Sequence, residues 1–160
     1  QAGRPSTRSG LEWTQQWTPR DVWRLNANLA WTRPRFTDSP ADATAIPNAV
    51  RKMASLAATL QPSGPWSGSW GLRYIGPSAL TADAGVVARA KVSSQLRVTR
   101  RLDPHADLSL DVLNLTNRRD ADMQYRYTSQ VAGEATPVDD THLHPTEPRS
   151  FRLNLRIRYP

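Results

Sequence analysis

The residues best suited to chemistry lie together near the C-terminal end of the chain. The run 139–144, with the sequence DDTHLH, places two imidazoles beside two carboxylates, and these side chains coordinate divalent metal ions. On an extended strand His142 and His144 share one face, because alternate residues do. Ligand types without a closed spacing are nevertheless a weak signal. We therefore favour a polar loop in which these groups pair with one another or with water, and we predict no metal and no cofactor.

No pattern of catalytic residues accompanies this run. The sequence contains no Cys, no nucleophile elbow and no phosphate-binding glycine loop. Its carboxylates are not spaced as a pair for acid–base catalysis. The chain is therefore predicted not to be an enzyme.

Three segments show the alternation of a β-strand. In 23–31, 66–74 and 151–159 an aromatic residue is followed by apolar residues at every second position and by another aromatic eight residues later. A period of two indicates strands with one apolar and one polar face. Eight steps of a strand tilted by about 40° rise roughly 20 Å, close to the ~25 Å apolar band of an outer-membrane barrel. The apolar face would then meet lipid, and the polar face a water-filled lumen.

Similar alternation along the chain predicts an all-β fold, an antiparallel up-and-down meander of about seven strands. The expected strands are about 8–17, 22–33, 49–61, 66–75, 89–100, 106–117 and 149–159. Short turns alternate with three long outer loops, at about 34–48, 76–88 and 118–148. This asymmetry is typical of a transmembrane barrel with its short turns in the periplasm, and it places the C-terminus there. Within the last loop, Met123, Tyr125 and Tyr127 alternate with polar residues, which predicts a projecting hairpin.

Aromatic residues near the strand ends are predicted to anchor the two membrane interfaces. At the periplasmic interface these are Trp17, Trp23, Trp66 and Tyr159, and at the outer interface Trp31, Tyr74 and Phe151. No apolar run of about 18 residues is present to form a transmembrane helix. The chain begins Gln1-Ala2-Gly3, with neither an initiator Met nor a signal peptide, so we interpret it as a piece of a longer protein.

The charged residues are interleaved with apolar residues, although the formal net charge is +7. This spread is typical of the hydrated inner wall of a barrel and not of a basic surface that binds nucleic acid. No nucleic-acid partner is predicted. The charges expected to face the lumen are Glu12, Arg24, Arg73, Lys91, Arg97, Asp107, Asp111, Arg152, Arg156 and Arg158. They either guide an anionic substrate or form ion pairs with neighbouring carboxylates, and we favour the ion pairs.

One pairing between the last two strands can be named. If Leu113 lies near Ser150, then Asp111 faces Arg152 in the antiparallel ladder. The same register places Asp107 opposite Arg156.

Four segments carry a resemblance to a known family. Residues 111–118 (DVLNLTNR) resemble the DVFNLFNR element on the penultimate strand of TonB-dependent outer-membrane receptors. Residues 46–51 (IPNAVR) are similar to their IPGAPRH segment, and residues 72–77 (LRYIGP) to LRYFGPR. Residues 148–155 (PRSFRLNL) resemble the closing PRSFRLSL. Together, in order and with matching gaps, these segments cover nearly the whole chain.

The resemblance implies that residues 1–160 are a partial, open segment of a 22-stranded transmembrane β-barrel in a Gram-negative outer membrane. Such receptors enclose an N-terminal plug and import scarce nutrients, commonly ferric siderophores, cobalamin, haem or glycans, with energy passed from TonB. The implied partners are the lipid bilayer with its lipopolysaccharide, the plug and remaining strands, TonB through the N-terminal region outside this chain, and a small-molecule or metal-chelate substrate. The family usually ends on an aromatic residue that the assembly machinery reads, whereas here Pro160 follows Tyr159.

The longest loop holds the candidates for substrate contact, because binding residues concentrate on loops. They are Tyr125, Arg126, Tyr127, His142 and His144. A loop that only shields the mouth of the barrel is an equal alternative, and the sequence does not identify the substrate.

Two other architectures compete with this interpretation. A soluble, basic β-barrel or sandwich that binds nucleic acid or polysaccharide would bury Leu25, Leu29, Leu56 and Leu110 against a second sheet. A translocator or adhesin barrel of another outer-membrane class would close with the strands present, and seven strands are both odd in number and too few. The receptor interpretation instead predicts an open, curved sheet with a bare apolar face.

Overall fold

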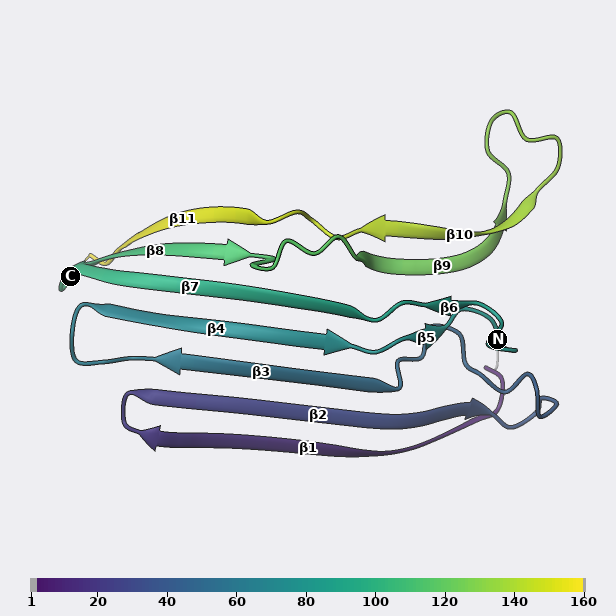
Figure 1. The fold of residues 1–160 in the computed structure, drawn as a ribbon, viewed down its shortest axis with the longest axis horizontal. Coiled ribbons are helices and arrows are strands. Elements are labelled where there is room, and N and C mark those ends of the chain that lie inside the picture. The colour runs from purple at the N-terminus through teal and green to yellow at the C-terminus, as the bar shows by residue number, and fades with distance from the viewer. Residues whose placement is uncertain (1–2, 160) are drawn as a thin grey trace.

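A computed structural model describes residues 3–159, and within them all regular secondary structure is β. The main sheet is antiparallel and has seven strands in the order β1-β2-β3-β4-β7-β8-β11 (Figure 1). These strands are β1 (Ser6–Arg20), β2 (Trp23–Phe36), β3 (Lys52–Leu60), β4 (Trp66–Ile75), β7 (Lys91–Asp103), β8 (Ala106–Leu113) and β11 (Ser150–Ile157). β1 and β11 do not pair with each other, so the sheet is open. The predicted fold class, an open antiparallel meander, is confirmed.

Two small ladders lie outside the main sheet. The hairpin of β9 (Ala121–Ser129) and β10 (Val138–Pro145) projects beyond the sheet where the sequence predicts one (Figure 1). The ladder of β5 (Ser78–Ala79) and β6 (Val87–Ala88) was not predicted. Strands of two residues are too short to give a periodic signal in the sequence.

The connections differ strongly in length at the two ends of the sheet. Residues 21–22, 61–65 and 104–105 form short turns, whereas residues 37–51, 76–90 and 114–149 form the long connections. Figure 1 shows the short turns and the C-terminus at one end, and the long connections at the other. The turn at 104–105 is stabilised locally, because the Asp103 carboxylate accepts a hydrogen bond from the His105 amide at 2.7 Å.

β2 continues past the predicted end at Arg33, through Pro34, to Phe36. The amide of Thr32 donates to the carbonyl of Arg51, on the side of β3. The backbone nitrogen of Pro34 also faces the side of β3, because the direction of the backbone amide repeats every second residue along a strand. β3 pairs with β2 only as far as Lys52, opposite Trp31, so no ladder bond is lost where Pro34 lacks its N–H.

β8 ends at Leu113 and not at the predicted Asn117. Asn114 and Asn117 have φ angles of +47° and +51°. This left-handed conformation cannot continue a strand, and Asn adopts it more readily than most residues. The chain therefore turns out of the sheet at Asn114.

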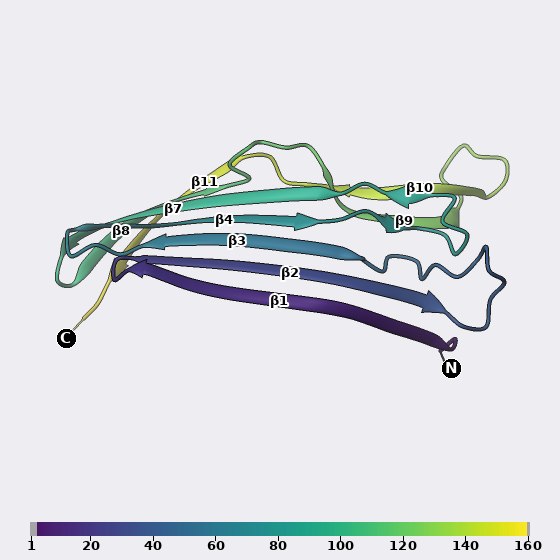
Figure 2. The same cartoon turned by 60° about the horizontal axis from the view of Figure 1, so that its bottom comes forward.

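The apolar face of the sheet has no second layer over it. Leu11 is 71% exposed and Leu153 is 70% exposed. Within residues 3–159 the buried apolar side chains are confined to Leu80, Ala88 and Val112. Figure 2, in a second orientation, shows the seven strands lying side by side in one curved layer.

These exposures overturn the soluble two-layer alternative. It requires burial of four leucines, but Leu29, Leu56 and Leu110 are 41–52% exposed and Leu25 is only half-buried. The alternative of a small closed barrel is also wrong, because the sheet is open. Among the described residues there is no helix that is both long and apolar enough to cross a membrane.

Candidate functional site

The charges predicted to face the lumen lie on one face of the sheet, which we call the polar face. Strand register shows this directly, because Thr59, Ser69, Arg97 and Asp111 are successive partners across four strands. The row extends to Arg24 on β2 and to Arg152 on β11 through the same pairing. Glu12, Arg73, Lys91, Asp107 and Arg156 fall on the same face by alternation. Arg158 follows the last residue of β11.

The register predicted for the last two strands is confirmed. Leu113 lies opposite Ser150, Asp111 opposite Arg152, and Asp107 opposite Arg156. The six aromatic residues predicted at the interfaces that lie on strands are exposed or half-exposed on the opposite, apolar face. Tyr159 follows β11 and is 86% exposed.

Asp111 nevertheless forms its ion pair with a residue of the strand on its other side. Arg97 on β7 donates through Nε to Oδ1 and through Nη2 to Oδ2, the latter at 2.8 Å. Asn154 on β11 donates to the same Oδ2 at 3.0 Å. The carboxylate is only 8% exposed, so these bonds replace its hydration. Register alone does not decide the partner, because Arg97 and Arg152 are both directly opposite Asp111.

Asp107 likewise pairs with a different arginine from the one opposite it. Its Oδ2 accepts from Nη2 of Arg158, although Arg156 is its register partner. Two of the carboxylates on the polar face are therefore already occupied by one arginine each.

The remaining arginines of the polar face have no carboxylate at ion-pair distance within residues 3–159. They are Arg8, Arg24, Arg73, Arg101, Arg152 and Arg156. Arg101 was missing from the predicted set because it lies next to a turn, but its register partner is Asp107 on the polar face. The face thus carries an excess of positive charge, which attracts anions.

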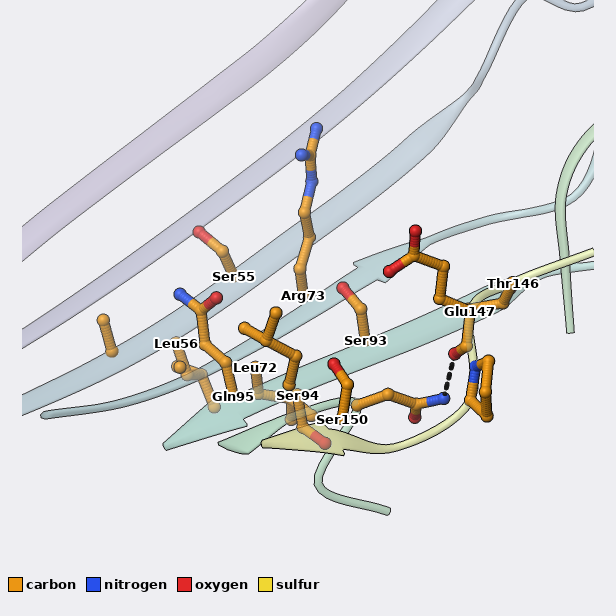
Figure 3. A pocket seen from close by; sticks show the side chains of 15 residues that line it. Ser55, Leu56, Leu72, Arg73, Ser93, Ser94, Gln95, Thr146, Glu147 and Ser150 are labelled. Carbon is orange, nitrogen blue, oxygen red and sulfur yellow. Dashed lines mark hydrogen bonds between the residues drawn. The ribbon is translucent and has the colours of Figure 1, made fainter. Parts of the chain in front are cut away.

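A hollow of about 470 Å³ lies over the middle of the polar face. It is lined by Ser55, Arg73, Ser93 and Gln95 from three strands, and by Glu147 from the connection that returns to β11. Figure 3 shows the side chains of Arg73 and Glu147 on the same side of the sheet as those of Ser55 and Ser93. This hollow offers both signs of charge and several hydroxyl groups to a polar ligand.

The five candidates for substrate contact lie on the projecting hairpin but not on one face of it. Tyr127 stacks on His142 with ring centroids 3.9 Å apart, and the Nε2 atom of His142 lies 3.1 Å from the hydroxyl of Ser129. Tyr125 and His144 share this face by alternation. We call it the aromatic face.

Arg126 lies on the other face of the hairpin. Its Nε donates to Oδ2 of Asp139 at 2.9 Å. Met123 was not among the candidates, but it lies opposite His144 on the aromatic face and is 53% exposed. Its alternation with Tyr125 and Tyr127 was the signal that could have included it. No group of three or more His, Asp or Glu residues among the described residues has a geometry suited to a metal ion.

One ion pair and one backbone hydrogen bond hold the base of the hairpin against the end of β7. Lys91 Nζ donates to the Asp122 carbonyl at 2.6 Å and to its carboxylate at 2.8 Å. Asp120 accepts from Arg118 Nε at 2.8 Å and lies 3.4 Å from the Val92 amide. The sequence interpretation missed these contacts, because about thirty residues separate the two partners and no periodicity relates them.

Both carboxylates are held in their charged form. The hydrogen bond from Arg118 keeps the pKa of Asp120 below its ordinary value, against the opposing effect of partial burial. The hydrogen bond and the positive charge of Lys91 lower the pKa of Asp122 in the same way. The contacts at the base of the hairpin are therefore intact at neutral pH.

No protein-family model matches the chain, and no curated protein sequence matches it. Solved structures do match its fold. The ferric yersiniabactin uptake receptor FyuA from Yersinia pestis superimposes with a TM-score of 0.76 at 17% identity, over 95% of this chain and 23% of that one. The siderophore receptor PiuA from Acinetobacter baumannii gives a TM-score of 0.73 at 16% identity, over 96% of this chain and 22% of that one.

The copper transporter OprC matches as well, with a TM-score of 0.68 at 18% identity over 95% of this chain and 24% of that one. The chain thus spans less than a quarter of the length of each of these proteins. The fold of this chain is therefore shared with a segment of each of these proteins, and the predicted open antiparallel sheet is confirmed.

Proposed function

We propose that this chain is the C-terminal wall segment of a TonB-dependent outer-membrane receptor that takes up a scarce small molecule or metal chelate. One observation carries the proposal. A single-layer sheet with an exposed apolar face shares its fold with proteins named as an uptake receptor, a siderophore receptor and a copper transporter. A face of this kind needs hydrocarbon or another apolar partner to cover it.

In this role each face of the sheet has its own solvent. Leu11, Leu29 and Leu153 contact lipid tails, while Arg73, Arg152 and the other polar-face residues line a hydrated lumen. The edges of β1 and β11 pair with the strands that complete the barrel. The plug and the region that contacts TonB lie outside this chain.

The short turns lie in the periplasm, and the long connections with the β9–β10 hairpin lie outside the cell. The aromatic residues near the two ends of the strands then occupy the two membrane interfaces. The hairpin, with its aromatic face, is the part of this chain that first meets a substrate arriving from the medium. The chain performs no catalysis in this scheme.

The substrate class that we propose is a metal chelate with negative charge. FyuA is named as a ferric yersiniabactin uptake receptor and PiuA as a siderophore receptor. The excess of arginine on the polar face favours an anionic cargo. Cobalamin, haem and glycans are the other substrates that the sequence resemblance implies.

Uptake by the complete receptor tests this proposal. The full-length protein is produced in a Gram-negative host that lacks its own ferric-chelate receptors, and accumulation of radiolabelled iron from catecholate and carboxylate chelates is measured with and without functional TonB. We expect the protein in the outer-membrane fraction and TonB-dependent accumulation of at least one anionic chelate. Recovery of the full-length protein in the soluble fraction would contradict the proposal.

A further inference from the structure

The two limbs of the projecting hairpin leave and rejoin the wall at the same place. The outgoing limb begins at Asn114, directly after β8, and the returning limb ends at Arg149, directly before β11. The outgoing turn is fastened to β7, because the Leu115 amide donates to the Ser94 carbonyl at 2.9 Å. A second bond within the turn runs from the Asn117 amide to the Asn114 carbonyl at 2.8 Å.

The side chain of Asn114 connects the two limbs. Its Oδ1 accepts from the Arg118 amide at 3.0 Å, and its Nδ2 donates to the Arg118 carbonyl at 2.9 Å. The same Nδ2 donates to the Glu147 carbonyl on the returning limb, also at 2.9 Å, as the dashed line in Figure 3 marks. Both functional atoms of this amide are therefore used.

The side chain of Asn117 makes a second connection, by its oxygen alone. Its Oδ1 accepts from the Arg149 amide at 3.1 Å. Both asparagines also have positive φ, a conformation that Gly, Asn and Asp tolerate better than other residues. The two positions thus combine a backbone requirement with a side-chain requirement.

We propose that Asn114 and Asn117 are positioning residues that set the direction in which the β9–β10 hairpin leaves the wall. They tie both limbs to one point at the end of the wall, so the hairpin with its aromatic face projects from the sheet at a defined place (Figure 1). A role of this placement in substrate capture rests on the proposed function, whereas the positioning itself does not.

Replacing Asn by Asp should move the hairpin at position 114 but not at position 117, because Asn114 uses its amide nitrogen as a donor and Asn117 uses only its oxygen as an acceptor. The substitution N114D keeps an acceptor for the Arg118 amide but removes the donor to Glu147, so it should release the returning limb. N117D keeps the acceptor for Arg149 and should leave the hairpin in place, whereas N117G removes it and keeps the backbone conformation. Loss of position by N114D and N117G but not by N117D is specific to the proposed bonds.

Distances measured by electron spin resonance on the full-length receptor in membranes test this inference. One spin label is placed at Thr128 on the hairpin and the other at Arg35 near the end of β2. N28D serves as the matched control, because Asn28 on the polar face also donates through Nδ2, to Ser55 at 3.0 Å, but lies away from the hairpin. Retention of the folded barrel is checked for each variant by its resistance to SDS without heating.

We expect N114D and N117G to broaden the distance distribution, and N117D and N28D to leave it as in the wild type. An unchanged distribution in N114D, or equal broadening in N117D and N117G, would overturn the inference. N114G is a second variant that keeps the turn if N114D fails to assemble, and it must broaden the distribution too. A wild-type receptor that shows a sharp distance but takes up no chelate would contradict the proposed function alone.

Discussion

Arg97 and Asp111 form a two-pronged ion pair across β7 and β8, where they are directly opposite in register. Asn154 on β11, the strand on the other side of β8, donates a further hydrogen bond to the carboxylate of Asp111. This unit joins three neighbouring strands through side chains as well as through the backbone ladder. Asp111 is the most buried charged group of the polar face among the described residues.

Replacing Asp111 by Ala should therefore weaken the barrel. The change leaves the Arg97 guanidinium and the Asn154 amide without their shared acceptor. Hydrogen bonds to charged groups contribute about 1.5–3 kcal/mol each, but Arg97 is half-exposed and recovers water, so we expect a loss of roughly 1–3 kcal/mol in total. The measurement is the temperature at which the full-length barrel unfolds in detergent. D107A, whose partner Arg158 lies beyond the strand, should cost less, and the reverse order would contradict the assignment.

Neutralising two unpaired arginines should reduce uptake of an anionic chelate. R73Q and R152Q remove positive charge from the polar face without breaking an ion pair of the described residues. Because the attraction is electrostatic, the loss of uptake rate should shrink as ionic strength rises. R20Q, at the end of β1 next to the short turn, is the control and should behave as the wild type. Equal uptake by all three variants at low salt would count against a cationic guide.

The aromatic face of the hairpin should matter more for substrate binding than its opposite face. Y127A removes a half-exposed ring that stacks on His142. A substrate group that packs on this ring would lose about 0.5–1.5 kcal/mol of aromatic contact, which corresponds to an affinity loss of roughly twofold to tenfold. R126Q alters only the contact with Asp139 on the other face. Binding isotherms of chelate to purified receptor check this difference. A larger effect of R126Q would show that the substrate meets the other face.

Acid should loosen the base of the hairpin only below the ordinary range of carboxyl groups. The pKa values of Asp120 and Asp122 are lowered by Arg118 and Lys91. A lowered pKa in the folded state gives stability that is present above the unfolded value of about 3.9 and is lost as the pH falls through the folded value. Protease cleavage within 118–148 should therefore be the same at pH 7 and pH 5 and should increase near pH 3. K91M should raise cleavage already at pH 7, since it removes the donor to Asp122.

The wall could be predicted from the sequence because its faces have different solvents. Alternation at period two fixes both the strand and the face, so the register of Asp111 and Arg152 followed from one assumed contact. Strand ends were harder to predict, because they depend on neighbours. β2 runs through Pro34 only because β3 has already ended, and β8 stops at Asn114 because of its left-handed turn.

Side-chain partners were not predictable in the same way. A residue inside a sheet has two opposite neighbours, and sequence alternation does not say whether Asp111 binds Arg97 or Arg152. The split of the hairpin candidates is different, since alternation already separates Arg126 from Tyr125 and Tyr127. Contacts such as Lys91 with Asp122 depend on how a long connection folds back, and no local pattern encodes that.

Solvent accessibility of spin labels on the two faces tests the central claim most directly. Single labels are introduced in the full-length receptor in lipid at Leu29, Leu56 and Leu110 on the apolar face, and at their neighbours Asn28, Ser55 and Ser109 on the polar face. We predict that the first set collides with oxygen dissolved in the bilayer and is shielded from a water-soluble nickel chelate, and that the second set shows the opposite preference. Leucine positions that are shielded from both reagents would mean that protein, and not hydrocarbon, covers this face.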